Sequence, residues 1–209
     1  MRRYLFVFVA FLLVAVFLTA CSTVEESTGQ APVLEKNKVL IEPSSLFEGD
    51  TKKLEPHLGW STGAVKVKYQ GDKKILNVSC ETWEKGKLVQ TFGSLGAGIE
   101  GSFDGEVSVS LKDDDGAGQN RYLATIVVSD KQGYSSSKVY VPKFNESATS
   151  STATSPKPLS APIEVSDEQT TAVWGLMAGE GTNISRSDES IEAMAQRVEW
   201  AFVLKLSFE

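Results

Sequence analysis

Ser61 and His57 are the residues of this sequence that could supply a nucleophile and a general base. Ser61 lies in Gly59-Trp60-Ser61-Thr62-Gly63, and the only histidine of the chain stands four residues before it. Nucleophile elbows with this glycine–serine–glycine spacing place the serine on a strained turn between a strand and a helix, and their base comes from far downstream. Here a polar stretch precedes the pattern and a strand-like segment follows it. The sequence therefore predicts a glycine-flanked loop, and catalysis by Ser61 stays an alternative.

The segment 113–120 gathers three carboxylates, Asp113, Asp114 and Asp115, with two glycines. Oxygen ligands in a glycine-containing loop suit a hard cation such as calcium. The segment lacks the alternating acidic spacing and the distant glutamate of an EF-hand loop. We predict a solvated acidic turn with no bound cofactor, and a weak calcium site is the alternative.

Four tryptophans, Trp60, Trp83, Trp174 and Trp200, could form a stacking surface for sugars. Trp174 and Trp200 alternate with polar or small residues in phase with other apolar side chains, so we expect them in the core. Trp60 stands among glycines in a predicted loop. It is therefore the candidate for an exposed ligand contact.

A second glycine pattern, Gly96-Ala97-Gly98-Ile99-Glu100-Gly101, has the spacing of a dinucleotide-binding loop. That loop requires a helix directly after it, so that the pyrophosphate meets the helix N-terminus. The sequence after Gly101 alternates like a strand. We expect an inter-strand loop and no nucleotide.

The N-terminus has the layout of an export signal. Arg2 and Arg3 precede an uncharged apolar run, which ends in Leu18-Thr19-Ala20-Cys21. This tetrad resembles the lipobox of bacterial lipoproteins. The resemblance implies cleavage of residues 1–20 and acylation of Cys21, and two or three acyl chains anchor a protein stably in a membrane. Residues 39–209 resemble no family that we recognise.

The resemblance also implies where the protein resides, namely anchored to the extracytoplasmic face of the cell membrane. In a host with two membranes, Ser22 matches the pattern sent to the outer membrane. Residues 21–38 are then the lipidated cysteine and a polar, flexible tether. The loss of residues 1–20 removes two of 21 basic residues and none of 27 acidic ones, which leaves a net charge of about −8. This charge argues against a nucleic-acid partner.

Short segments with a two-residue apolar period begin near Val39 and are separated by turn sequences about every ten residues. With Cys21 acylated, Cys80 is the one remaining thiol, so the core must form without an intramolecular disulfide. Its alternation with Leu76 and Val78 predicts a buried side chain. The clearest alternating segments are 65–69, 76–82, 107–111, 122–128 and 137–141.

The C-terminal part adds a loop, a helix and a strand to this pattern. Residues 145–162 are rich in Ser, Thr and Pro, which predicts a mobile loop. Ser187-Asp188-Glu189 indicates the N-cap of a helix of about ten residues. The apolar series from Val198 to Phe208 predicts a core strand with a solvated outer face. We therefore predict one mainly β domain over residues 39–209, an antiparallel β-sandwich of about seven to nine strands with one short helix before the last strand.

These features favour a non-catalytic, membrane-anchored lipoprotein of the cell envelope. Its sandwich would present a surface to another protein or to an envelope polymer. A calcium-dependent adhesion protein, a carbohydrate-binding lipoprotein and a serine hydrolase that uses Ser61 are the alternatives.

Overall fold

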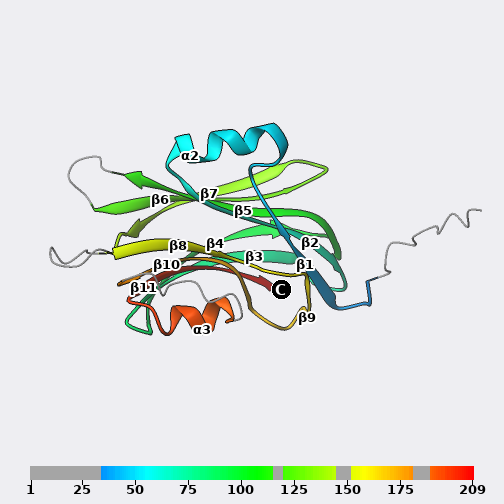
Figure 1. Ribbon diagram of the computed structural model, residues 1–209. Helices are drawn as coiled ribbons and strands as arrows, with labels where there is room; N and C mark the ends of the chain where they lie inside the picture. Colours follow the sequence, from blue (N-terminus) through cyan, green and yellow to red (C-terminus); the bar gives the residue numbers. More distant parts are fainter. Residues whose placement is uncertain (1–33, 115–119, 145–151, 181–188) are drawn as a thin grey trace, which may run out of the picture. The chain divides into compact units, whose positions relative to one another are not determined.

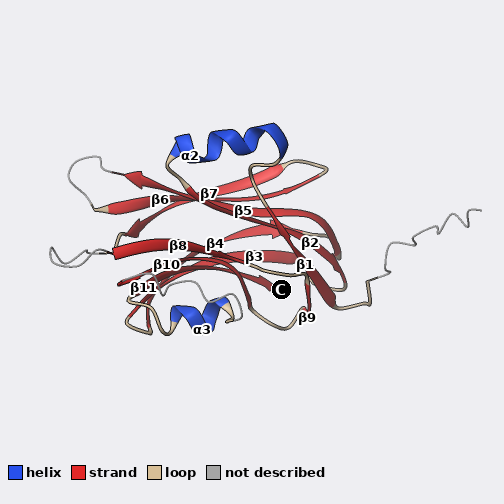
Figure 2. Cartoon of the chain, in the orientation of Figure 1, coloured by secondary structure: helices blue, strands red, loops and turns tan. Residues whose placement is uncertain are grey.

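The computed structural model describes residues 34–114, 120–144, 152–180 and 189–209, and it builds them into two antiparallel sheets (Figures 1 and 2). The strands are β1 (Lys38–Ser44), β2 (Ser61–Gln70), β3 (Ile75–Glu84), β4 (Lys87–Gly98), β5 (Ser102–Asp114), β6 (Arg121–Asp130), β7 (Tyr134–Pro142), β8 (Thr152–Pro158), β9 (Ile163–Ser166), β10 (Thr171–Glu180) and β11 (Trp200–Phe208). The helices are the 3-10 helix η1 (Gly49–Leu54), α2 (Glu55–Leu58) and α3 (Ile191–Ala195).

The two sheets pack as a sandwich. The larger has six strands in the order β7-β6-β5-β2-β1-β9, and the smaller has five in the order β4-β3-β11-β10-β8. This confirms a mainly β, sandwich-like fold with a short helix before the last strand. The described residues hold more strands than the seven to nine predicted, because β8 and β9 carried no clear alternating pattern.

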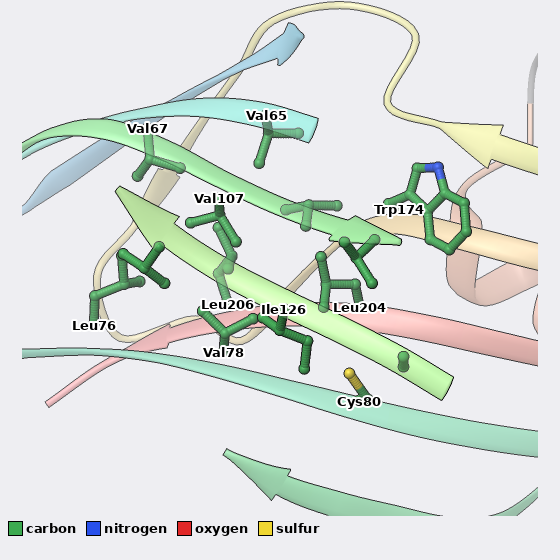
Figure 3. Close-up of a cluster of buried hydrophobic side chains, with 14 of the residues drawn as sticks. Val65, Val67, Leu76, Val78, Cys80, Val107, Ile126, Trp174, Leu204 and Leu206 are labelled. Carbon is green, nitrogen blue, oxygen red and sulfur yellow. The ribbon is translucent and has the colours of Figure 1, made fainter. Parts of the chain in front are cut away.

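The core lies between the sheets and consists of the inward side chains of alternating strand positions (Figure 3). Trp174 and Trp200 are each 1% exposed, as predicted, and the Trp174 indole meets the Phe202 ring edge-on. Burial of one large aliphatic side chain contributes roughly 1.5–3 kcal/mol to the free energy of folding. The residues labelled in Figure 3 are Val65, Val67, Leu76, Val78, Cys80, Val107, Ile126, Trp174, Leu204 and Leu206.

The loop predicted at 145–162 is partly wrong. Within it, Thr152–Pro158 forms β8, which pairs antiparallel with β10 from Trp174↔Pro158 to Glu180↔Thr152. As the edge of its sheet, β8 has one side without a strand partner in the described structure, so prolines at 156 and 158 are compatible with it. Residues 145–151 lie outside the described part of the chain.

The solvated outer face predicted for the last strand is also wrong over part of its length. Ala201 and Val203 point away from the main core, yet both are fully buried, because α3 packs over them. The strand therefore has two apolar faces at this point. Its pairing partner β10 shows the same double burial, since Met177 also lies beneath α3.

The helix is shorter than predicted and starts later. Ser190 caps it, since its hydroxyl accepts the backbone N–H of Ala193 at 3.1 Å, and α3 ends at Ala195. Residues 187 and 188, where the sequence predicted the cap, lie outside the described residues. The predicted apolar positions Ile191, Met194 and Ala195 are all buried.

Cys80 is fully buried in the core, as predicted, and burial raises the pKa of its thiol from 9.0 to about 12. Between these pH values the unfolded chain ionises and the folded chain does not. The Cys80 thiol therefore does not change the free energy of unfolding below pH 9. Between pH 9 and pH 12 its ionisation in the unfolded chain lowers that free energy by about 1.4 kcal/mol per pH unit.

We expect the substitution Cys80→Ala to reduce this decrease in the free energy of unfolding at alkaline pH. Between pH 9 and pH 11, the free energy of unfolding of the variant should fall less than that of the wild type, by roughly 2–3 kcal/mol. Urea denaturation at each pH measures both values. The constant cost of the small cavity cancels in the comparison, and parallel pH curves would contradict the prediction.

Candidate interaction surface

Ser61 and His57 belong to different elements of secondary structure. Ser61 is the first residue of β2 and is half-buried, whereas His57 lies in α2 and is exposed. No hydrogen bond joins these two side chains, both of which the structure describes. The neighbouring hydroxyl of Thr62 instead donates to Glu55 Oε1 at 3.3 Å. A short helix thus precedes Ser61 and a strand follows it, the reverse of the order at a nucleophile elbow.

Gly59 and Gly63 are each glycine for a different structural reason. Gly59 ends α2 in the left-handed region with φ of 61°, which favours glycine after a helix. Gly63 lies in β2 directly against the Trp174 indole, and a β-carbon there would overlap the ring. The pattern therefore reflects a helix end and a core contact.

The acidic segment begins at the end of β5. Asp113 pairs with Lys143 at 3.1 Å, and Asp114 pairs with Arg121 at 2.7 Å, so each of these carboxylates faces a cation across the sheet. Asp115 lies outside the described residues. Within the described part, no group of three His, Cys, Asp or Glu side chains is placed to hold a metal ion.

The second glycine pattern spans a strand end and a turn. Gly96 and Gly98 lie in β4, and Gly101 takes a positive φ of 81° in the turn before β5. The loop predicted here is thus confined to three residues. No helix follows Gly101, since the next element is β5.

Trp60 is one of the large apolar side chains that the described structure leaves exposed. Its side chain is 37% exposed, and the neighbouring Leu54 and Leu58 are 55% and 38% exposed. The Lys112 ammonium is 6.0 Å from the centre of the Trp60 ring, a cation–π contact. We call Leu54, Leu58, Trp60 and Lys112 the Trp60 surface.

The helical segment that carries this surface contributes nothing to the core. Neither η1 nor α2 has a buried residue, although Leu54 and Leu58 are large and apolar. Figure 1 shows both helices on the outer side of the six-stranded sheet, away from the other sheet. Internal packing therefore explains these two leucines only in part, since Leu54 is 55% and Leu58 38% exposed.

Polar contacts hold the segment from its flanks. Ser45 and Phe47 form a local turn before η1, and the Thr51 hydroxyl donates to the Glu48 carbonyl at 2.7 Å. Lys53 pairs with Asp50 at 3.2 Å on the fully solvated side. The apolar side chains thus lie among charged residues, which is the composition of many protein interfaces.

A second aromatic–cation pair lies at the same end of the sheet. The Arg121 guanidinium carbon is 3.6 Å from the centre of the Tyr140 ring, and Tyr140 is 52% exposed. Register places Lys112 beside Leu123 and Leu123 beside Tyr140 on this outer face. The outer face therefore carries a row from Trp60 to Tyr140. The sequence indicated Trp60 but not Leu54, Leu58 or Tyr140, because an exposed leucine or tyrosine has no signature in a single sequence.

A buried polar cluster marks the opposite end of the sandwich. The Tyr69 hydroxyl donates to Asp167 Oδ2 and accepts the Lys73 backbone N–H, both at 2.9 Å, and Asp167 is 4% exposed. Burial is the main cause that raises the pKa of Tyr69, and the Lys73 contact opposes it. The cluster joins the β2–β3 turn to the β9–β10 turn beside the start of β1, so it has a structural role.

Comparisons with protein-family models, with curated proteins and with solved structures found no match to this chain. Of the helices that the structure describes, none has the length and hydropathy needed to cross a bilayer.

Proposed function

We propose that this protein is a non-catalytic lipoprotein, anchored through Cys21 to the extracytoplasmic face of a bacterial membrane, that binds another envelope protein through the Trp60 surface. One observation carries the binding part of the proposal: η1 and α2 bury no residue, yet they expose Leu54 and Leu58 beside Trp60. Exposed apolar side chains that cluster and are rimmed by charges are typical of binding sites.

The position of the surface also supports the proposal. Lys38, the first residue of β1, pairs with Gln70 at one end of β2, and Trp60 precedes Ser61 at the other end. Nine strand residues separate these ends by about 30 Å. The Trp60 surface thus lies at the opposite end of β2 from Lys38.

A protein partner fits these side chains better than a polysaccharide. Sugar sites pair an aromatic platform with several polar groups that bind hydroxyls, whereas Leu54 and Leu58 extend the Trp60 surface with aliphatic groups. Tryptophan contributes more than most residues to protein interfaces. A polymer partner is an outcome that the experiment below distinguishes.

Site-specific photocrosslinking in intact cells tests the proposal. A photoreactive amino acid at position 60 of the full chain should give one adduct of discrete mass, and the same amino acid at Val89 should not. Val89 is a suitable control because it is apolar and 56% exposed, but lies on β4 of the other sheet. A smear that glycan hydrolases remove would indicate a polymer. Equal adducts at both positions, or none, would contradict binding through this surface.

Trp60→Ala should abolish most of the binding while it leaves the fold intact. Loss of a central interface tryptophan commonly costs at least 2 kcal/mol of binding free energy, so we expect affinity for the crosslinked partner to fall at least about 30-fold. The free energy of unfolding should fall by about 1–2 kcal/mol, because the indole is only 37% exposed in the folded chain. Val89→Ala is the matched control and should bind like the wild type.

A further inference from the structure

Strand β7 forms one edge of the six-stranded sheet and is regular along its whole length. It pairs with β6 on one side from Arg121↔Pro142 to Ser129↔Tyr134 with no register shift. In the described structure no strand pairs with its other side, although β4, an edge strand of the other sheet, lies close to β7. A long, regular edge presents backbone donors and acceptors to any strand of another chain, and soluble proteins usually block such edges.

The other three sheet edges are each interrupted. Pro156 and Pro158 lie in β8, and β9 is four residues long. The pairing of β4 with β3 has irregularities at Val78/Cys80 and again at Thr82/Trp83. Prolines, short edge strands and bulges all disfavour edge-to-edge pairing. Among the described edges, β7 alone has no bulge, no short length and no proline before its last residue, Pro142, and its one charged side chain is Lys138.

The two tyrosines of β7 lie at equal distances from Ser137, three residues to either side. Tyr134 and Tyr140 lie on the outer face, as their partners Ser129 and Leu123 do, and Tyr134 is 76% exposed. Residues 135–137 are serine, and Lys138 and Val139 follow them. The edge thus has an exposed aromatic ring near each end and one charged side chain between the rings.

We infer that two copies of this chain associate by antiparallel pairing of their β7 strands about Ser137. In this register the Tyr134 ring of each copy lies opposite the Tyr140 ring of the other. Ser136 of each copy lies opposite Lys138 of the other. Aromatic pairs directly across two antiparallel strands stabilise the pairing. The interface is isologous, which is the usual form of a two-fold dimer.

The neighbouring registers are less favourable. Pairing about Lys138 places the two Lys138 side chains directly opposite each other and brings Pro142 into the paired region. Pairing about Ser136 places Tyr134 opposite Lys138 and leaves Tyr140 without an aromatic partner. Like charges directly across a strand pair are destabilising. The charge and the proline therefore select the register about Ser137.

The dimer is independent of the proposed function. In the order β7-β6-β5-β2, the strand that follows Trp60 is separated from β7 by two strands, so pairing through β7 leaves the Trp60 surface uncovered. A dimer would display two Trp60 surfaces. Failure of either proposal would leave the other standing.

Cysteine crosslinking of the full chain in membranes of producing cells tests the register. Directly opposed residues in antiparallel strands have Cα atoms about 4.5–5.5 Å apart, within the range of a disulfide. A mild oxidant should therefore link Ser137→Cys to itself. In cells that make both variants, it should link Ser136→Cys to Lys138→Cys. Neither Ser136→Cys nor Lys138→Cys should link to itself. In a dimer of either variant the two cysteines would lie on opposite sides of the two-fold axis at Ser137 and would not be directly opposed. Native Cys80 adds no background, because it is buried and its pKa is about 12.

Two controls make the outcome decisive. Thr91→Cys, exposed on the β4 edge, should not form a disulfide dimer. Adding Ser136→Lys to Ser137→Cys sets a lysine opposite Lys138 and should lower the dimer yield severalfold, whereas Ser136→Glu should maintain or raise it. The inference is overturned if neither β7 combination links, if Thr91→Cys links equally, if Lys138→Cys links to itself, or if the adduct contains a different protein.

Discussion

Replacing Cys21 with alanine is expected to abolish acylation of the protein. In bacterial cells fed a tagged palmitate, the wild-type chain should carry the label, and the Cys21→Ala variant should carry only background. The resemblance to a lipobox implies that the acyl chains attach through the thiol and amine of this one residue. Each buried methylene of an acyl chain contributes about 0.8 kcal/mol to membrane binding. Removing two or three chains therefore removes the anchor.

The other cysteine supplies the matched control. Cys80 lies in the core, so Cys80→Ala should keep the full label. The mass of the purified chain gives a second measurement, because the wild type should lack residues 1–20 and the Cys21→Ala variant should retain them. Equal labelling of all three proteins, or an uncleaved and unlabelled wild type, would disprove the anchor and with it the membrane part of the proposed function.

The strands that the sequence predicted best are those with one buried and one solvated face. Val65, Val67 and Tyr69 on β2 are buried, while Lys66 and Lys68 between them are exposed, so alternation identified this strand. Gly86 takes a positive φ of 76° in the turn between β3 and β4, a backbone conformation that favours glycine. Local patterns suffice where one face of a strand meets water.

The predictions failed where tertiary structure changed the environment of a strand. β8 has no apolar alternation, and it is a strand only because β10 offers it a complete ladder of partners. β11 alternates, but α3 covers its second face, and the small residues Ala201 and Gly175 let the helix approach the sheet. These effects depend on pairings between residues distant in sequence, so a single sequence does not reveal them.

The candidate site shows a similar division. Trp60 stood out because it lies among glycines, and the structure leaves it exposed. Leu54 and Leu58 looked like ordinary apolar residues, because a sequence does not show that a helix lacks a buried face. The strand that the sequence indicated after the glycine–serine–glycine pattern is β2, which begins at Ser61. The reason for Gly63, a close contact with Trp174, became visible only in the structure.

The substitution Gly63→Ala should destabilise the fold by about 1–3 kcal/mol, the usual range for an overpacked core. A β-carbon at this position overlaps the Trp174 indole, which is 1% exposed and has no free space to move into. Gly93→Ala is the matched control. Gly93 also lies in a strand and has no positive φ, and a β-carbon added there would meet no atom within 4 Å, so its substitution should change stability by less than about 0.5 kcal/mol. The urea midpoint at constant slope measures both variants.

A double-mutant cycle with Trp174→Phe identifies the cause of the loss. The smaller ring leaves room for the new methyl group, so Gly63→Ala should cost less in the Trp174→Phe background than in the wild type, by at least about 1 kcal/mol. An equal cost in both backgrounds would mean that the strand itself rejects alanine at position 63. A lower cost in the Trp174→Phe background would show that overlap with the indole, and not the strand backbone, causes the loss of stability.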